Sequence, residues 1–71
     1  MHSNKIDFLI YCIEIYKSCK KMSGKEVITL FDRFCVTNFI LDCYDVLHTE
    51  GEKTITWEID DFLTHHLNPI S

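Results

Sequence analysis

Residues 4–22, NKIDFLIYCIEIYKSCKKM, restrict the fold most, because this stretch has helical periodicity but more apolar surface than an ordinary surface helix. At about 100° per residue, one face of the expected helix carries Phe8, Tyr11, Cys12, Ile15, Cys19 and Met22. A second face beside it carries Ile6, Leu9, Ile10, Ile13 and Tyr16. A helix on one side of a small bundle needs an apolar stripe of a little over about 100°, and this one is apolar over about twice that arc. Other helices or another chain must therefore cover it.

The pattern SGKE at residues 23–26 predicts where a second helix begins. Ser23 is a favourable cap and Glu26 stands three residues later, so each side chain can bond the other residue's backbone N–H. Apolar residues then follow at helical spacing: Val27, Leu30, Phe31 and Phe34.

The next residues, CVTN at 35–38, predict a turn followed by a new helix cap at Thr37 or Asn38. The third helix should run from there to about His48, and Gly51 should end it in the left-handed conformation. Its expected apolar face consists of Phe39, Ile40, Cys43, Tyr44, Val46 and Leu47.

A last helix is expected from about Thr56 to His66, with Trp57 pointing away from its apolar side. Before it, KTITW at residues 53–57 alternates and is β-branched, which is typical of a short extended segment. The chain shows no linker or repeat. We therefore expect an all-α fold: one domain over residues 1–71, with about four helices and a helix-turn-helix-like core.

Composition and charge limit the setting and the partners. The chain has 71 residues, a net charge of −4 and 46% hydrophobic residues, so a single core is only marginally sufficient and extra burial is favourable. The negative charge weighs against phosphate backbones and anionic lipid. No signal-like segment, CxxC pair or membrane-length apolar run occurs. We expect free thiols, a cytoplasmic location and no membrane contact.

The helix-turn-helix outline of residues 23–51 raises the question of DNA binding. A recognition helix needs Arg, Lys, Asn or Gln toward base edges and basic neighbours on phosphates. Residues 37–51 contain no Lys or Arg but include Asp42, Asp45 and Glu50. The sequence therefore favours a scaffold over a DNA reader.

Metal binding and catalysis receive no support from the spacing of reactive residues. Cys12 and Cys19 are seven residues apart on an apolar face, unlike the short-spaced ligand pairs of zinc sites. His65 and His66 point about 100° apart on a helix and suit its carboxyl end by charge. No glycine-rich phosphate loop and no hydrolase motif are present. We expect no catalytic residue, metal ligand or cofactor, and no enzyme.

Two explanations remain open for the wide apolar surface of residues 4–22. In the first, this helix is central and its aromatic residues belong to the core. In the second, one of its faces stays exposed and meets another chain, with its basic end orienting the partner. The partner-binding residues predicted on this hypothesis are Leu9, Ile13, Tyr16, Lys17, Lys20 and Trp57.

Four segments of the chain, NKIDFLIYCIEIYK, MSGKEVITLF, CYDVLHTEG and IxWEIDDFL, together resemble a family of short bacterial proteins of unknown function. The resemblance covers nearly the whole chain. Such families are often encoded beside a second small protein similar to ADP-ribosyltransferases. The resemblance therefore implies a toxin–antitoxin or immunity pair.

These observations predict a non-catalytic protein–protein interaction module, an antitoxin- or immunity-like partner of an ADP-ribosyltransferase-like protein. One alternative is a helix-turn-helix regulator that binds DNA. Another is a homodimeric structural protein with no toxin partner.

Overall fold

Five helices make up the part of the chain that the computed structural model describes, residues 4–67. In chain order they are α1 (Asn4–Lys20), α2 (Gly24–Arg33), α3 (Val36–Asp42), α4 (Tyr44–Leu47) and α5 (Glu52–Leu67). No strand occurs within these residues. The predicted all-α fold is confirmed, with one helix more than the four expected.

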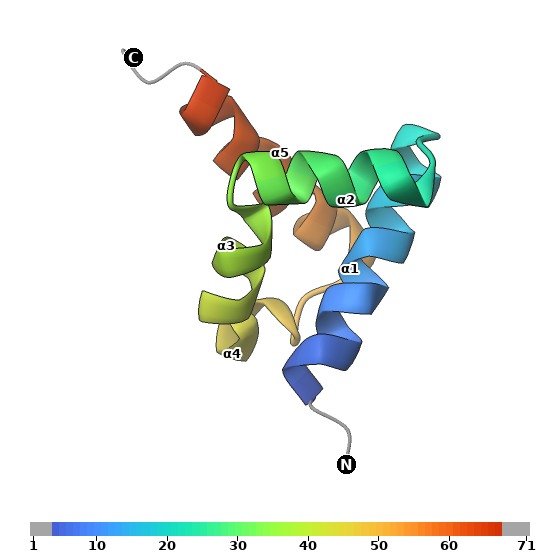
Figure 1. The fold of residues 1–71 in the computed structure, drawn as a ribbon. Helices are drawn as coiled ribbons and strands as arrows, with labels where there is room; N and C mark the ends of the chain where they lie inside the picture. The colour runs from blue at the N-terminus through green and yellow to red at the C-terminus, as the bar shows by residue number, and fades with distance from the viewer. Residues whose placement is uncertain (1–3, 68–71) are drawn as a thin grey trace.

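The helix α1 packs against α2, α3 and α5, and the short helix α3 contacts all four other helices. Figure 1 shows α2 crossing the upper ends of α1 and α3, with α5 behind them and α4 below α3. The core formed between the helices consists of Phe8, Cys12, Tyr16, Val27, Phe31, Val36, Ile40, Leu47, Ile55, Ile59 and Leu63. Both predicted faces of α1 contribute residues to the core, so much of the wide apolar surface of α1 is buried inside the protein.

The start of α2 agrees with the sequence prediction. Ser23 is the N-cap, and its hydroxyl accepts a hydrogen bond from the Glu26 N–H at 3.1 Å. The Glu26 carboxylate accepts one from the Ser23 N–H at 2.9 Å. This reciprocal pair satisfies two of the backbone donors that a helix start leaves free, and it orients Val27 and Phe31 into the core.

The start of α3 differs from the prediction, which placed the cap at Thr37 or Asn38. The N-cap is Cys35, which has φ 59° in the left-handed region and makes no side-chain capping bond. Val36 follows it as the first residue of α3 and has no exposed surface, so this helix begins at a residue of the core. The connection between α2 and α3 is therefore shorter than the sequence suggested.

The predicted third helix is interrupted at Cys43, which separates α3 from α4. Leu47 is buried as expected, but Val46 is 60% exposed, so its assignment to the apolar face is wrong. Two side chains end α4 locally. Nδ1 of His48 lies 2.6 Å from the Tyr44 carbonyl oxygen, and the Thr49 hydroxyl donates to the Val46 carbonyl at 2.7 Å.

Because those carbonyls already have partners, α4 does not need a left-handed glycine at its end. No glycine of the described residues has a positive φ, so the prediction for Gly51 is wrong. Its carbonyl instead accepts the Ile55 N–H at 3.0 Å, at the beginning of α5.

The extended segment predicted at residues 53–57 is also wrong, because these residues belong to α5. Ile55 and Ile59 are four residues apart, as one face of a helix requires, and neither has exposed surface. Helical spacing of the buried residues therefore overrides the β-branched composition. Trp57 points away from that face, as predicted, and is 61% exposed.

Candidate functional site

The hydroxyl of Tyr16, one of the six predicted partner-binding residues, points into the protein. Tyr16 is 4% exposed and packs against the Phe31 ring with centroids 5.5 Å apart. The hydroxyl donates a hydrogen bond to Oδ1 of Asp60 at 2.7 Å. Burial, followed by this hydrogen bond, raises the pKa of Tyr16. Tyr16 is a core residue, so its prediction as part of an exposed face is corrected.

The charged end of α1 is also engaged with α5. Nζ of Lys20 lies 2.6 Å from Oδ2 of Asp60, so one carboxylate receives both Tyr16 and Lys20. The hydrogen bond to Asp60 raises the pKa of Lys20. Lys17 forms a pair with Glu14 of its own helix at 3.6 Å. Lys20 thus helps fix α5 against α1, while the ion pair of Lys17 stays within α1.

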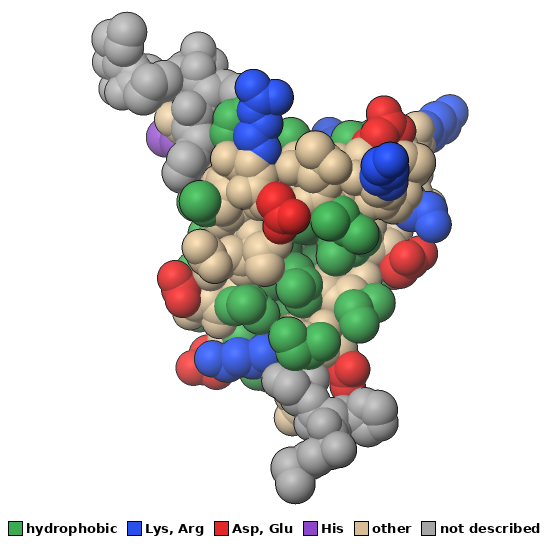
Figure 2. Space-filling view, in the orientation of Figure 1, with side chains coloured by type: hydrophobic (Ala, Val, Ile, Leu, Met, Phe, Trp, Pro, Cys, Tyr) green, Lys and Arg blue, Asp and Glu red, His purple; other side chains and the backbone are tan. Residues whose placement is uncertain are grey.

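Leu9 and Ile13 are half-buried and pack against the core. On the same side of α1 lie Ile6 and Ile10, which are 48% and 54% exposed. We call these four residues the apolar flank of α1. Figure 2 shows hydrophobic side chains gathered over the lower half of α1 and the space between α1 and α3. The sequence grouped the same four residues on one face, and the structure leaves the outer two accessible.

Trp57 does not join this flank. It lies on α5 directly after Thr56 and one turn after Lys53, two residues that line a cleft between α5 and α1. On α1 that cleft is lined by Ile15 and Ser18, which lie about 180° from Ile6 and Leu9 around the helix axis. Of the six predicted residues, two lie on the flank (Leu9 and Ile13), one in the core (Tyr16) and one beside the cleft (Trp57). The other two, Lys17 and Lys20, form ion pairs at the carboxyl end of α1.

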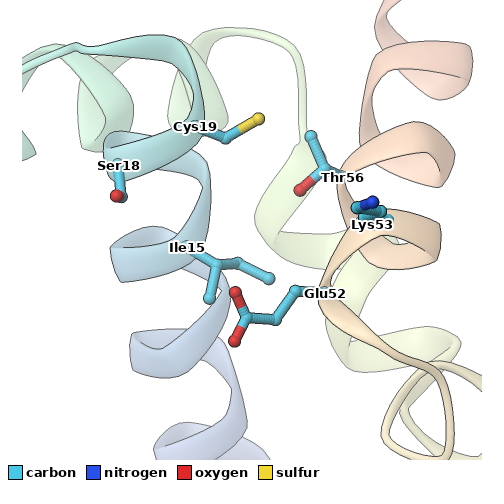
Figure 3. Close-up of a pocket in the computed structure, with 6 residues that line it drawn as sticks. All are labelled: Ile15, Ser18, Cys19, Glu52, Lys53 and Thr56. Carbon is cyan, nitrogen blue, oxygen red and sulfur yellow. The ribbon is translucent and has the colours of Figure 1, made fainter.

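The cleft between α1 and α5 was not foreseen from the sequence. It has a volume of about 270 Å³ and is lined by Ile15, Ser18, Cys19, Glu52, Lys53 and Thr56 (Figure 3). The Cys19 thiol is directed from α1 toward α5, and the Thr56 hydroxyl is directed back toward α1. The sequence pattern of residues 53–57 indicated an extended segment and therefore could not predict the cleft. A helix places Glu52, Lys53 and Thr56 on one side, whereas an extended segment would not.

A second, shallower hollow lies along α2 and has a volume of about 410 Å³. Its lining combines apolar side chains with charged ones: Met22, Lys25, Glu26, Thr29, Leu30, Arg33 and Phe34. The Arg33 guanidinium lies 5.7 Å from the centroid of the Phe34 ring, so its charge rests on the aromatic face.

The four cysteines differ in access. Cys12 is buried, and burial raises the pKa of its thiol to about 12, which keeps it protonated at neutral pH. Cys43 is half-buried, whereas Cys19 and Cys35 are exposed. Cys19 and Cys35 are therefore the two thiols that lie exposed at the surface.

Metal-ligating side chains do not cluster within the residues that the structure describes, since no group of three or more His, Cys, Asp or Glu could hold an ion there. Nδ1 of His65 lies 2.8 Å from the backbone oxygen of Asp61 and 3.7 Å from its carboxylate, a local contact along α5. None of the five helices is long and apolar enough to cross a bilayer.

Comparison with known protein families gives a match over most of the chain. A family model described as "Protein of unknown function (DUF3791)" matches residues 7–66, which include all but the outer ends of α1 and α5. Neither the curated proteins nor the solved structures contain a match. The chain therefore belongs to this family of proteins of unknown function.

Proposed function

We propose that this member of the family is a non-catalytic module that binds another protein through the apolar flank of α1. The observation that carries the proposal is the exposure of Ile10 and Ile6, at 54% and 48%, beside the half-buried Leu9 and Ile13. Contiguous apolar side chains at the surface of a small protein are typical of interaction sites. Burial of this flank against a partner would also add the apolar contact that so small a core lacks.

The partner in this proposal is an ADP-ribosyltransferase-like protein encoded beside the gene in a bacterium, and the module acts as its antitoxin or immunity protein in the cytoplasm. The resemblance of the four quoted segments supports this choice, and the charge distribution agrees with it. The overall charge of −4 favours a protein partner over nucleic acid, and Lys17, next to the flank on α1, offers a positive charge to orient it.

Light scattering of the purified protein, alone and mixed with the neighbouring protein, tests the proposal. The expected result is a monomer near the 8.4 kDa mass of the chain that forms a complex when the neighbour is added. A tight dimer that ignores the neighbour would overturn this choice of partner and favour a homodimer. A salt-sensitive shift of a DNA duplex would favour a regulator instead.

Two matched variants identify the surface. Ile10→Asp places a charge on the flank, and Ile28→Asp places the same charge on α2 at a residue that is 48% exposed. Ile10→Asp should weaken the complex at least about tenfold, because a buried carboxylate without a partner is costly, and Ile28→Asp should not. Circular dichroism should show that both variants fold. Equal affinities for both variants would exclude the flank.

A further inference from the structure

We propose that the cleft between α1 and α5 is a modification site, where Cys19 exchanges with a small disulfide whose arms carry carboxylates, such as glutathione disulfide. This inference goes beyond the proposed partner and does not depend on it. It rests on three observations: an accessible thiol, a buried hydroxyl without a protein partner, and a cation at the same cleft.

The thiol lies where a small molecule can reach it. Cys19 belongs to the last turn of α1, is exposed, and directs its sulfur across the cleft toward α5 (Figure 3). The volume of about 270 Å³ is just below the range of roughly 300–1,000 Å³ for ligand sites, so the cleft suits one arm of a small disulfide and not a larger ligand. A covalent bond to Cys19 would hold such an arm in place without a deep pocket.

The hydroxyl of Thr56 is the second observation. Thr56 is 9% exposed, lines the cleft, and directs its oxygen toward α1. Within the described residues the hydroxyl oxygen of Thr56 has no hydrogen-bond partner. Each fully buried side-chain oxygen or nitrogen in this part of the chain does have a partner, so the Thr56 oxygen must keep some exposed surface. A nearly buried hydroxyl that faces a cleft is available to a group bound in it, because an unmade hydrogen bond is unfavourable.

The charges of the cleft select the kind of disulfide. Lys53 lines it from α5 with a positive charge, while Glu52 lies at the opposite end, near Ile15 (Figure 3). A glutathione arm carries carboxylates and an ammonium group, so it presents the opposite charge to each of these residues. Such complementarity raises the encounter rate and fixes orientation more than it adds affinity.

The chemistry is a balanced exchange. The Cys19 thiolate attacks one sulfur of the disulfide, a new S–S bond forms, and the old one breaks. The departing sulfur leaves as a thiolate and takes up the proton that Cys19 released. Cys19 is oxidised and the departing thiol is reduced, with no further reactant. An excess of the reduced small thiol reverses the reaction, which is typical of regulatory rather than structural disulfides.

The test exposes the full-length protein to glutathione disulfide and follows each cysteine by peptide mass spectrometry. Cys35 is the internal control, because it is exposed but does not line the cleft. Cys19 should react at least about fivefold faster than Cys35, as expected from one favourable charge pair near the surface. The Cys19→Ser variant should lose this fast phase. Equal rates at the two residues would overturn the proposal.

A second measurement separates recognition in the cleft from simple exposure. Lys53→Gln should slow the reaction of Cys19 with glutathione disulfide several-fold, but it should leave the reaction with uncharged 2-hydroxyethyl disulfide unchanged. Lys5→Gln, at the opposite end of α1, should alter neither rate. If Lys53→Gln has no selective effect, Cys19 is only an exposed thiol and the modification site is rejected.

Discussion

The two short connections on either side of α2 end one helix and begin the next by different means. Each contains a residue other than glycine in the left-handed conformation: Lys21 before α2, with φ 55°, and Cys35 after it, with φ 59°. In the first connection the Met22 N–H returns to the Lys17 carbonyl at 3.0 Å, which closes the end of α1. In both places the chain changes direction within a few residues, so that α2 lies across the ends of α1 and α3 (Figure 1).

The connections differ in what fixes the next helix. Before α2, Ser23 and Glu26 bond each other's backbone and hold the helix start with polar groups at the surface. Before α3 there is no side-chain cap, and the fully buried Val36 anchors the helix to the core. A helix start can therefore be specified by local hydrogen bonds or by burial, and the two should respond differently to mutation.

The largest expected effect is at the buried anchor. Val36→Ala should lower the free energy of unfolding by about 2–3 kcal/mol, because it leaves a cavity beside the fully buried Ile40. Urea denaturation followed by circular dichroism measures this. Val46→Ala is the matched control, since Val46 is 60% exposed and its loss should change the free energy by less than about 0.5 kcal/mol. Similar losses for both variants would contradict anchoring by Val36.

The next effect is at the polar cap. Ser23→Ala should lower the free energy of unfolding by about 1 kcal/mol, because it leaves the Glu26 N–H without its hydrogen-bond acceptor. The same urea titration applies. Ser18→Ala removes a hydroxyl from within α1, where no such bond is made, and it should be neutral or slightly stabilising. A loss at Ser18 as large as that at Ser23 would show that capping is not the cause.

This difference also explains what the sequence could predict. The cap at Ser23 involves only four consecutive residues, so the local pattern was sufficient to predict the start of α2. Once that start was known, helical periodicity placed Val27 and Phe31 on the buried face. The start of α3 depends on the burial of Val36 in the core. The local sequence pattern does not show where the core lies, so it could not predict this start. The prediction chose Thr37 or Asn38 because those residues have capping side chains, which this connection does not use.

In the candidate site, too, local features could be predicted from the sequence, whereas contacts between distant segments could not. The four flank residues of α1 share a face by simple periodicity, so the sequence grouped them correctly. Periodicity could not show where the core ends along that face, and it assigned Tyr16 to the exposed surface. Its partner Asp60 lies 44 residues away in sequence. The cleft at Cys19 also lies between segments that are distant in sequence. Predicting it would have required residues 53–57 to be assigned to a helix, whereas their β-branched composition indicated an extended segment.

A smaller effect is expected from relief of the left-handed backbone at Cys35. Cys35→Gly should raise the free energy of unfolding by about 0.5 kcal/mol. The strain of about 1–2 kcal/mol for a left-handed side chain disappears, while the flexibility of glycine in the unfolded chain offsets part of the gain. Thermal and urea unfolding measure it. Cys35→Ala keeps a β-carbon in the strained conformation and should not stabilise, so equal gains in both variants would argue against strain.

The smallest effect is the pH dependence of the cap. The hydrogen bonds from the Ser23 backbone and side chain lower the pKa of the Glu26 carboxylate below its usual value of 4.5. A carboxylate with a lowered pKa in the folded state stabilises the protein above its unfolded pKa, and this contribution is lost as the pH falls through the folded pKa. Glu26→Gln keeps a side-chain oxygen that can accept from Ser23 but removes the charge near the start of α2. The difference in free energy of unfolding between the wild type and Glu26→Gln should therefore be constant from pH 7 to about pH 5 and vanish at lower pH, where Glu26 is protonated. If the difference instead persists at pH 2.5, the charge of Glu26 contributes nothing, and hydrogen bonding alone accounts for the start of α2.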